Sequence, residues 1–446
     1  MSGGFLKPRP GFATAAIHAG QEAEKWKSAA VVPPIVTSTT FKQFAPAEHS
    51  GYDYGRAGNP MRNTLEECLA ALDGGIYAFA FASGLGAITS VVAMLSKGDH
   101  IVATNDLYSG TNRLFRNVVS RLGIDVTFVD ISDLDDLCSS IQDSTKMIWI
   151  ESPTNPLMKV IDIGKTVRIV KRRGPILIVV DNTLLTPYLQ RPLEFGADIV
   201  VYSLTKYMNG HSDVIMGAAV VDEVAIAEKL RFLQNTMGIV PSPFDCYLVN
   251  RSLKTLALRM ERHRATAIII ARFLERHPFV DEVMHPGLKS HKHHNIAKRQ
   301  TAGHSGVFSF RHAGELEHSK KILSSLKVFT LAESTGGYES LAELPSMMTH
   351  ASVPEQMRTE LGITDTLIRL SVGLEDVQDL VKDLDQAIHH AFHENEAYVD
   401  HIRPSQIRPS MDQFRFSGGL SEEPNPAGSP NPPNEIQAGS AQNTQS

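Results

Sequence analysis

The sequence predicts an α/β fold with a large, mostly parallel sheet covered by helices on both faces, followed by a smaller C-terminal α/β domain. Short apolar runs rich in β-branched residues alternate with helix-like segments between residues 58 and 257, a pattern typical of βαβ units. The chain has 446 residues, which is long enough for two or more domains. Ligands of such sheets bind beyond the carboxyl ends of the strands, so functional residues are expected there.

Four regions follow one another along the chain. Residues 1–57 are rich in Pro, Gly and Thr and predict an extended N-terminal arm. Residues 58–257 carry the large sheet, with helix-like segments such as 112–122 and 166–173 between most of its strands. The expected strands are Ala78–Ala82, His100–Ala103, Val126–Val129, Met147–Ile150, Ile176–Val180 and Ile199–Tyr202. Residues 258–395 form the second domain, and the Pro-, Ser- and Asn-rich residues 396–446 predict a disordered tail.

Composition excludes several classes of protein. The formal net charge of -6 argues against nucleic acid or an anionic membrane surface as the main partner. No stretch reaches the roughly 18 apolar residues that would span a bilayer. The three cysteines, Cys68, Cys138 and Cys246, are widely spaced, so neither a disulfide framework nor a metal site is expected. A cytoplasmic protein in a reducing compartment is the expectation.

Polar groups follow two neighbouring strands of the predicted sheet. Asp181 comes directly after Ile176–Val180, and a carboxylate at such a buried position is costly unless it meets a cation. Ser203, Thr205 and Lys206 follow the next strand. Two hydroxyls can bind one anion, and a partly desolvated lysine can form an imine. Taken singly, an aspartate that caps a turn and a surface lysine are the more ordinary interpretations.

Two further groups lie at the same predicted edge. Gly84 and Leu85 open a helix-like stretch, where free N–H groups can bind an anion, although good helix packing explains them equally well. Tyr108 follows another strand and offers a face for a flat ring, or is an ordinary half-buried tyrosine. Together these groups suit a phosphate, a planar ring, a cationic ring nitrogen and an aldehyde. They predict a site for pyridoxal 5'-phosphate (PLP).

The chain resembles the Cys/Met-metabolism family of PLP-dependent enzymes from about residue 12 to about residue 393. The motifs that carry the resemblance are Tyr54-Gly55-Arg56, Gly58-Asn59-Pro60, Ala82-Ser83-Gly84-Leu85, Glu151-Ser152-Pro153-Thr154-Asn155-Pro156, Val180-Asp181-Asn182-Thr183, Ser203-Leu204-Thr205-Lys206-Tyr207, Asn209-Gly210-His211, Leu331-Ala332-Glu333-Ser334 and Ile368-Arg369-Leu370-Ser371-Val372-Gly373. The resemblance implies the fold type I of PLP-dependent transferases. It leaves the residues beyond 395 outside.

The resemblance also implies roles in cofactor binding. Lys206 would form the Schiff base with PLP, Asp181 would pair with the ring nitrogen, and Tyr108 would stack on the ring. The phosphate would be held by Gly84, Leu85, Ser203 and Thr205. Members of the family place the equivalents of Tyr54 and Arg56 at the phosphate of a neighbouring subunit. A homo-oligomer is therefore implied, usually a tetramer, with an N-terminal arm on the neighbour and an active site shared across a dimer.

For the substrate, the resemblance implies that Arg369 binds the carboxylate bidentately, through two parallel hydrogen bonds, helped by Asn155 and Ser334. Arg113 resembles a second arginine near the substrate. Without the resemblance, a structural ion pair and a solvated helix face would be the preferred interpretations of the two arginines. Glu333 would attract the distal ammonium of cystathionine, as in the gamma-lyase branch of the family, although the gamma-synthase branch can share this acid.

The implied activity is a PLP-dependent α,γ-elimination of L-cystathionine to L-cysteine, 2-oxobutyrate and ammonia, with hydrogen sulfide released from cysteine or homocysteine as a side activity. Lys206 and Tyr108 would be the catalytic residues. A gamma-synthase, which is a transferase, and a catalytically idle oligomeric binding protein are the alternatives. Leu184, Ser109 and Gly86 depart from the residues common in the family, but none of them removes a catalytic group.

Overall fold

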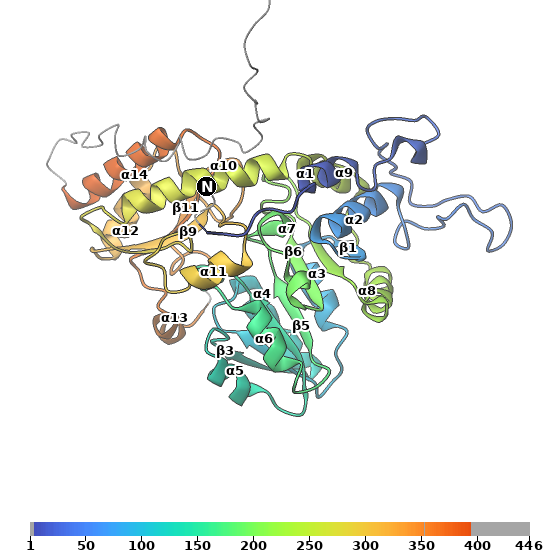
Figure 1. Ribbon diagram of the computed structural model, residues 1–446, viewed down its shortest axis with the longest axis horizontal. Helices are drawn as coiled ribbons and strands as arrows, with labels where there is room; N and C mark the ends of the chain where they lie inside the picture. Colours follow the sequence, from blue (N-terminus) through green and yellow to red (C-terminus); the bar gives the residue numbers. More distant parts are fainter. Residues whose placement is uncertain (1–3, 352, 394–446) are drawn as a thin grey trace, which may run out of the picture.

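The computed structural model describes residues 4–351 and 353–393, and Figure 1 shows two sheets joined by long helices. The larger sheet has seven strands in the order β1-β7-β6-β5-β4-β2-β3. These strands are β1 Tyr77–Phe81, β2 His100–Thr104, β3 Asp125–Val129, β4 Thr145–Glu151, β5 Leu177–Asp181, β6 Ile199–Ser203 and β7 Gly217–Val221. The neighbours from β6 to β3 pair in parallel, whereas β7 runs antiparallel to both β1 and β6. The predicted parallel sheet is confirmed.

Helices cover both faces of this sheet, which explains the continuous apolar runs of its strands. Val200 packs into the cluster that holds helices α2, α9 and α10, whereas the next residue, Val201, packs into the cluster on the opposite face with α3 and α8. The helices of this half are α1 Phe12–His18, α2 Pro60–Asp73, α3 Gly84–Val92, α4 Ser109–Asn117, α5 Leu134–Ser140, α6 Ile163–Val170, α7 Thr186–Leu189, α8 Val224–Met237 and α9 Pro243–Leu253.

The smaller sheet follows helix α10 (Leu256–Leu274), which crosses the top of Figure 1. Its strand order is β10-β11-β12-β9-β8, and only β10 and β11 pair in parallel. The strands are β8 Val280–Met284, β9 Val307–His312, β10 Thr330–Leu331, β11 Leu341–Glu343 and β12 Leu367–Ser371. The remaining helices are α11 His294–Gln300, α12 Leu316–Ser325, α13 Glu355–Leu361 and α14 Val377–Phe392. Helices α10, α12 and α14 share one apolar cluster with this sheet.

The structure differs from the sequence prediction in three places. The N-terminal arm contains helix α1, whose Phe12 and Ala16 are buried in the main core. The expected helix 112–122 is instead α4, which ends at Asn117 and is followed by a short 3₁₀ turn. Strand β7 was not predicted. The expected disordered tail, 396–446, lies outside the described residues, and among the helices of the described part none is long and apolar enough to cross a membrane.

Candidate active site

The carboxyl ends of strands β4, β5 and β6 open onto a cavity of about 300 Å³. Eight of the predicted site residues line it: Gly84, Leu85, Tyr108, Asn155, Asp181, Ser203, Thr205 and Lys206. Its lining also includes Glu151, Thr183, Leu184 and Thr335. The cavity therefore lies where ligands of open α/β sheets bind.

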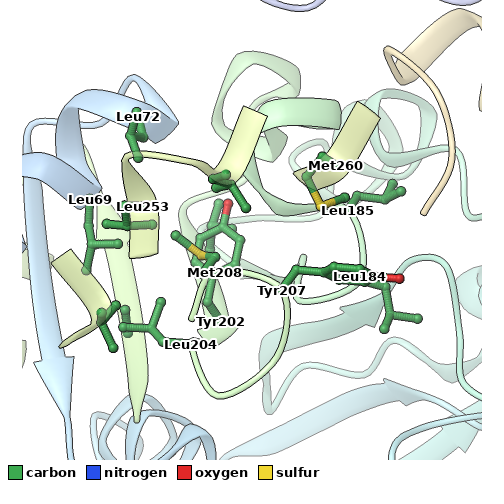
Figure 2. Packing of buried hydrophobic residues seen from close by; sticks show 14 of the residues in the cluster. Leu69, Leu72, Leu184, Leu185, Tyr202, Leu204, Tyr207, Met208, Leu253 and Met260 are labelled. Carbon is green, nitrogen blue, oxygen red and sulfur yellow. The ribbon is translucent and has the colours of Figure 1, made fainter. Parts of the chain in front are cut away.

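Lys206 is held in the cavity by the apolar residues on either side of it in the sequence. Figure 2 shows Leu204, Tyr207 and Met208 packed into the core with residues of α2, α9 and α10. The Lys206 ammonium donates to Ser334 Oγ at 3.1 Å. Burial, helped by the positive charge of Arg369, lowers the pKa of Lys206 to about 8. An amine with this pKa is available as a nucleophile near neutral pH far more readily than an exposed lysine.

Asp181 is the last residue of β5, and it lies next to Glu151, the last residue of β4, in register across the two parallel strands. The Asp181 carboxylate accepts a hydrogen bond from the Thr183 backbone N–H at 3.0 Å. Among the described residues no lysine, arginine or histidine forms an ion pair with it, and burial raises its pKa. A buried carboxylate in this position has room and electrostatic need for a cation.

Glu151 had no predicted role, because a single acid in a motif gives no sign of its partner. Its carboxyl accepts a hydrogen bond from the Tyr108 backbone N–H at 2.9 Å. Burial, and secondly the nearby Asp181, raises the pKa of Glu151 well above its usual range. Burial therefore disfavours the charged form of Glu151 more strongly than that of Asp181, which makes Asp181 the better candidate of the two to meet a cation.

The first turn of α3 forms a cradle in the cavity wall beside Ser203. Ser83 caps the helix by accepting from the Gly86 N–H at 2.9 Å, and the first N–H groups of a helix lack an intrahelical partner. A Cβ added to Gly84 would lie 3.1 Å from the Ser203 Cβ, so glycine lets the turn approach β6 closely. The cradle, with the hydroxyls of Ser203 and Thr205 lining the cavity, suits a phosphate.

These features fit PLP. A phosphate at the α3 cradle, a ring nitrogen at Asp181 and an aldehyde at Lys206 would use the three polar sides of the cavity. Tyr108, which is 37% exposed, precedes α4 and offers its ring as the stacking face. The residues that depart from the family pattern pack tightly. Leu184 is buried in the cavity wall, Ser109 is buried in α4, and Gly86 leaves no room for a methyl group beside Ile239.

Arg369 of β12 lies beside this cavity and is 3% exposed. Its Nη1 donates to Asn155 Oδ1 at 3.1 Å and lies 2.7 Å from a carboxylate oxygen of Glu343, which the sequence did not single out. Its Nη2 donates to the Ser334 backbone carbonyl at 2.9 Å. Ser334 thus contacts both Arg369 and Lys206, and the predicted trio Arg369, Asn155 and Ser334 is brought together.

The other predicted residues do not line the cavity. Glu333 is exposed, although its negative charge acts on Lys206 and raises the pKa of that lysine slightly against the effect of burial. Arg113 is exposed on α4. Tyr54 is 47% exposed on the arm, with the Arg56 guanidinium 5.4 Å from its ring centre. Arg56 also donates to the Asn235 carbonyl at 3.2 Å.

Comparison with known proteins places this geometry in context. Residues 13–389 match the family model described as Cys/Met metabolism PLP-dependent enzyme. The chain is 56% identical over 387 residues to the proteins named cystathionine gamma-lyase from Sus scrofa and Homo sapiens, covering 87% of this chain and 96% of each relative. Among solved structures, MetB from Corynebacterium glutamicum is 44% identical with a TM-score of 0.83, covering 85% of this chain and 98% of that one. Cystathionine gamma synthase from Xanthomonas oryzae pv. oryzae, in complex with cystathionine, is 40% identical with the same TM-score and the same coverage.

Proposed function

The chain belongs to the Cys/Met metabolism family of PLP-dependent enzymes and is a carbon–sulfur lyase, and from this premise we propose that it cleaves L-cystathionine by α,γ-elimination. The products are L-cysteine, 2-oxobutyrate and ammonia. One observation carries the proposal: Ser334 contacts Lys206 through its hydroxyl and Arg369 through its carbonyl. One residue thereby holds an amine-reactive lysine close to an arginine that can bind a carboxylate, the two functions that recognition of an α-amino acid requires.

PLP, when bound, supplies an electron sink for a carbanion at the α carbon of an amino acid. Lys206 would hold it covalently, Asp181 would keep a proton on its ring nitrogen, and Tyr108 would stack on its ring. Its phosphate would be bound by the N–H groups of Gly84 and Leu85 and by the hydroxyls of Ser203 and Thr205. The lowered pKa of Lys206 favours the neutral amine that such a bond requires.

Arg369 and Asn155 would bind the substrate α-carboxylate and so decide which bond at the α carbon is oriented for cleavage. Lys206 is then placed to take the α proton. Breaking the bond between the γ carbon and sulfur releases a thiolate with the bonding electrons, and Tyr108 or Lys206 would protonate it as general acid. Water completes the balance by converting the remaining four-carbon fragment to 2-oxobutyrate and ammonia. The same steps would release hydrogen sulfide from homocysteine.

Glu333 and Arg113 would act on the distal half of the substrate. Glu333 is exposed near the cavity and contributes a negative charge at Lys206, which suits attraction of the distal ammonium of cystathionine. Arg113 is exposed on α4, whose first residue follows Tyr108, and would face the distal carboxylate.

The test is a steady-state assay of the PLP-loaded protein with L-cystathionine that measures 2-oxobutyrate and pyruvate in parallel. Predominant 2-oxobutyrate supports the proposal, whereas predominant pyruvate would mean β-cleavage and would refute it. Lys206→Ala serves as the control for product that does not depend on the site, and it should show no turnover.

A gamma-synthase is the second candidate, because solved relatives that share 40% identity with the chain carry that name. This activity would join cysteine to an activated homoserine. Incubation with cysteine and O-succinylhomoserine separates the two: net formation of cystathionine would favour the synthase over the lyase.

We further propose that the protein is a cytoplasmic homo-oligomer. It would be a tetramer in which each active site is shared between the two subunits of a dimer. The projecting arm exposes Val31, Val32 and Phe44 together with Tyr54, as expected of a segment that packs on a neighbouring subunit. The cysteines Cys68, Cys138 and Cys246 are all free thiols, which suits a reducing compartment. Light scattering of the purified protein tests the oligomeric state.

A further inference from the structure

A buried acid lies directly opposite the carboxylate-binding arginine. Glu343 ends strand β11 and is the register partner of Arg369 on the neighbouring antiparallel strand β12. The side chains are 1% and 4% exposed, and Glu343 Oε1 lies 2.7 Å from Arg369 Nη1. Because strand register fixes the pair, its geometry does not depend on a loop.

The hydrogen bonds of Arg369 use one part of its guanidinium and leave another part available. Nη1 donates to Asn155 Oδ1 and lies 2.7 Å from Glu343 Oε1 in an ion pair, so it already has two partners in the protein. Nη2 donates to the Ser334 carbonyl, which leaves it a second hydrogen. The Nε–H is buried and has no partner among the described residues. Nε and Nη2 therefore each keep one hydrogen without an acceptor in the described part of the chain. The two nitrogens lie along one edge of the guanidinium and can donate two parallel hydrogen bonds to a carboxylate.

Glu343 is itself restrained. Thr349 donates to Glu343 Oε1 at 2.9 Å, and the Thr349 hydroxyl also lies 3.0 Å from Nδ1 of the buried His350. The acceptor oxygen that holds Nη1 is thus fixed from its far side as well. Without it, the guanidinium would keep one neutral hydrogen bond on each Nη group, to Asn155 and to Ser334, but would lose the charged partner that draws Nη1 toward β11.

We infer that Glu343 is a positioning residue: by holding Nη1, it turns the Nε–Nη2 edge of Arg369 toward the α-carboxylate of the substrate. This inference rests on the proposed function, in which Arg369 binds that carboxylate. It assigns Glu343 no contact with the substrate or with the reacting atoms. Its effect is a preference for ligands that present a carboxylate in the plane of this edge.

The experiment compares binding of L-alanine and L-alaninamide to the PLP-loaded protein by titration of the cofactor absorbance. The two ligands share the amine, but the amide lacks the carboxylate, so the ratio of their dissociation constants isolates recognition by Arg369. We expect Glu343→Ala to reduce the preference for alanine by about 10-fold or more. A misoriented Arg369 would lose one of the two charge-assisted hydrogen bonds that it makes to the ligand carboxylate. Glu343→Gln keeps an acceptor for Nη1 and should retain at least a third of the wild-type preference.

Two controls separate positioning from general damage. Glu339→Ala removes an exposed acid from the same stretch, one that accepts from Thr330 instead of Arg369, and it should leave the ratio unchanged. In the Arg369→Ala background, Glu343→Ala should add nothing to the ratio, because Glu343 acts only through Arg369. Thr349→Val, which removes one restraint on Glu343, should give a smaller reduction in the same direction.

Several results would overturn the inference. Equal weakening of alanine and alaninamide would indicate a purely structural ion pair, and a stronger preference for alanine in Glu343→Ala would show that Glu343 competes with the ligand for Arg369. A Gln variant as defective as the Ala variant would exclude positioning by acceptor geometry. The ratio needs no turnover, so it remains informative even if the cystathionine assay refutes the proposed activity.

Discussion

Asp181 and Glu151 form a matched pair with which the charge requirement of the site can be tested. Both acids end parallel strands, both are buried, and they are in register with each other. Neither acid forms a salt bridge among the described residues, and burial raises the pKa of Glu151 further than that of Asp181, so Asp181 is the better candidate for the charged form. Asp181→Asn removes the negative charge that would meet the protonated ring nitrogen of PLP. Glu151→Gln replaces the acid whose charged form burial disfavours more strongly with an amide of the same shape.

The expected effects differ in size for a physical reason. Removing one partner of a buried ion pair costs about 3–5 kcal/mol, because the other charge is left uncompensated. At about 1.4 kcal/mol per factor of ten, this predicts a loss in kcat/KM of roughly 100-fold to several thousand-fold for Asp181→Asn. Glu151→Gln should lose less than about 10-fold, since it disturbs only the hydrogen bond that Tyr108 N–H donates to it.

The assay measures 2-oxobutyrate from L-cystathionine at saturating PLP, with cofactor content determined for each variant. Losses of similar size in the two variants would refute the assignment of charge to Asp181 alone. A larger loss in Glu151→Gln would mean that Glu151 is the charged partner of the ring.

Three more predictions follow from the contacts described. A Cβ at Gly84 would lie 3.1 Å from Ser203 Cβ, beside the α3 turn proposed to bind the phosphate, so Gly84→Ala should weaken PLP binding by about 10-fold in equilibrium dialysis. The control Gly164→Ala, where a Cβ would meet only ordinary contacts at 3.5 and 3.8 Å, should leave PLP binding unchanged. Burial raises the pKa of Asp73 to about 7 from 3.8, so the folded state loses stability as pH rises from about 4 through 7. Asp73→Asn avoids this loss and should therefore unfold at a higher temperature than wild type at pH 8, with little difference at pH 4. The gain in unfolding free energy at pH 8 should be at most about 4 kcal/mol. If Arg56 serves the neighbouring subunit, inactive Arg56→Ala and Lys206→Ala proteins should regain activity when they are refolded together. Recovery should reach about a quarter of wild-type activity, because about half of random dimers are mixed and each mixed dimer has one intact site. No recovery in mixed oligomers would contradict a shared site.

Six of the seven strands of the larger sheet were predicted to within two residues, because their apolar, β-branched runs reflect burial on both faces. Strand β7 escaped prediction for the opposite reason. It begins Gly217-Ala218-Ala219, and a side chain at Gly217 would collide with the Ser83 backbone, so the space beside the α3 turn requires small residues with weak strand preference. Helix α1 was missed because its short apolar face is completed only by packing on α2 and α10.

The candidate site was predicted unevenly for similar physical reasons. Asp181, Ser203 and Lys206 could be singled out because each lies at or shortly after the end of a recognisable strand, and parallel strands bring their ends together. Glu343 and Glu151 could not, since their roles depend on partners that only pairing reveals. Arg369 opposes Glu343 through the antiparallel register of two short strands, and the Tyr108 N–H reaches Glu151 from a different loop. Arg369 itself was found only through the resemblance.

The site is assembled from two sheets, so its geometry depends on how they are joined. The cofactor side rests on β4 to β6, and the carboxylate side rests on β11 and β12. Tyr207, next to Lys206, is fully buried, and its hydroxyl accepts from the Gly306 N–H at 2.8 Å just before β9.

A second contact fixes the other side of the same junction. Ser309 of β9 donates to the Pro156 carbonyl at 2.7 Å, immediately after Asn155. Strand β9 pairs directly with β12, where Ser309 is the register partner of Arg369. The strand that holds Arg369 is therefore tied to the residue beside Lys206 and to the loop of Asn155. These buried bonds connect the strand of Arg369 to the segments that carry Lys206 and Asn155, which explains how groups from two sheets can be held together in one candidate site.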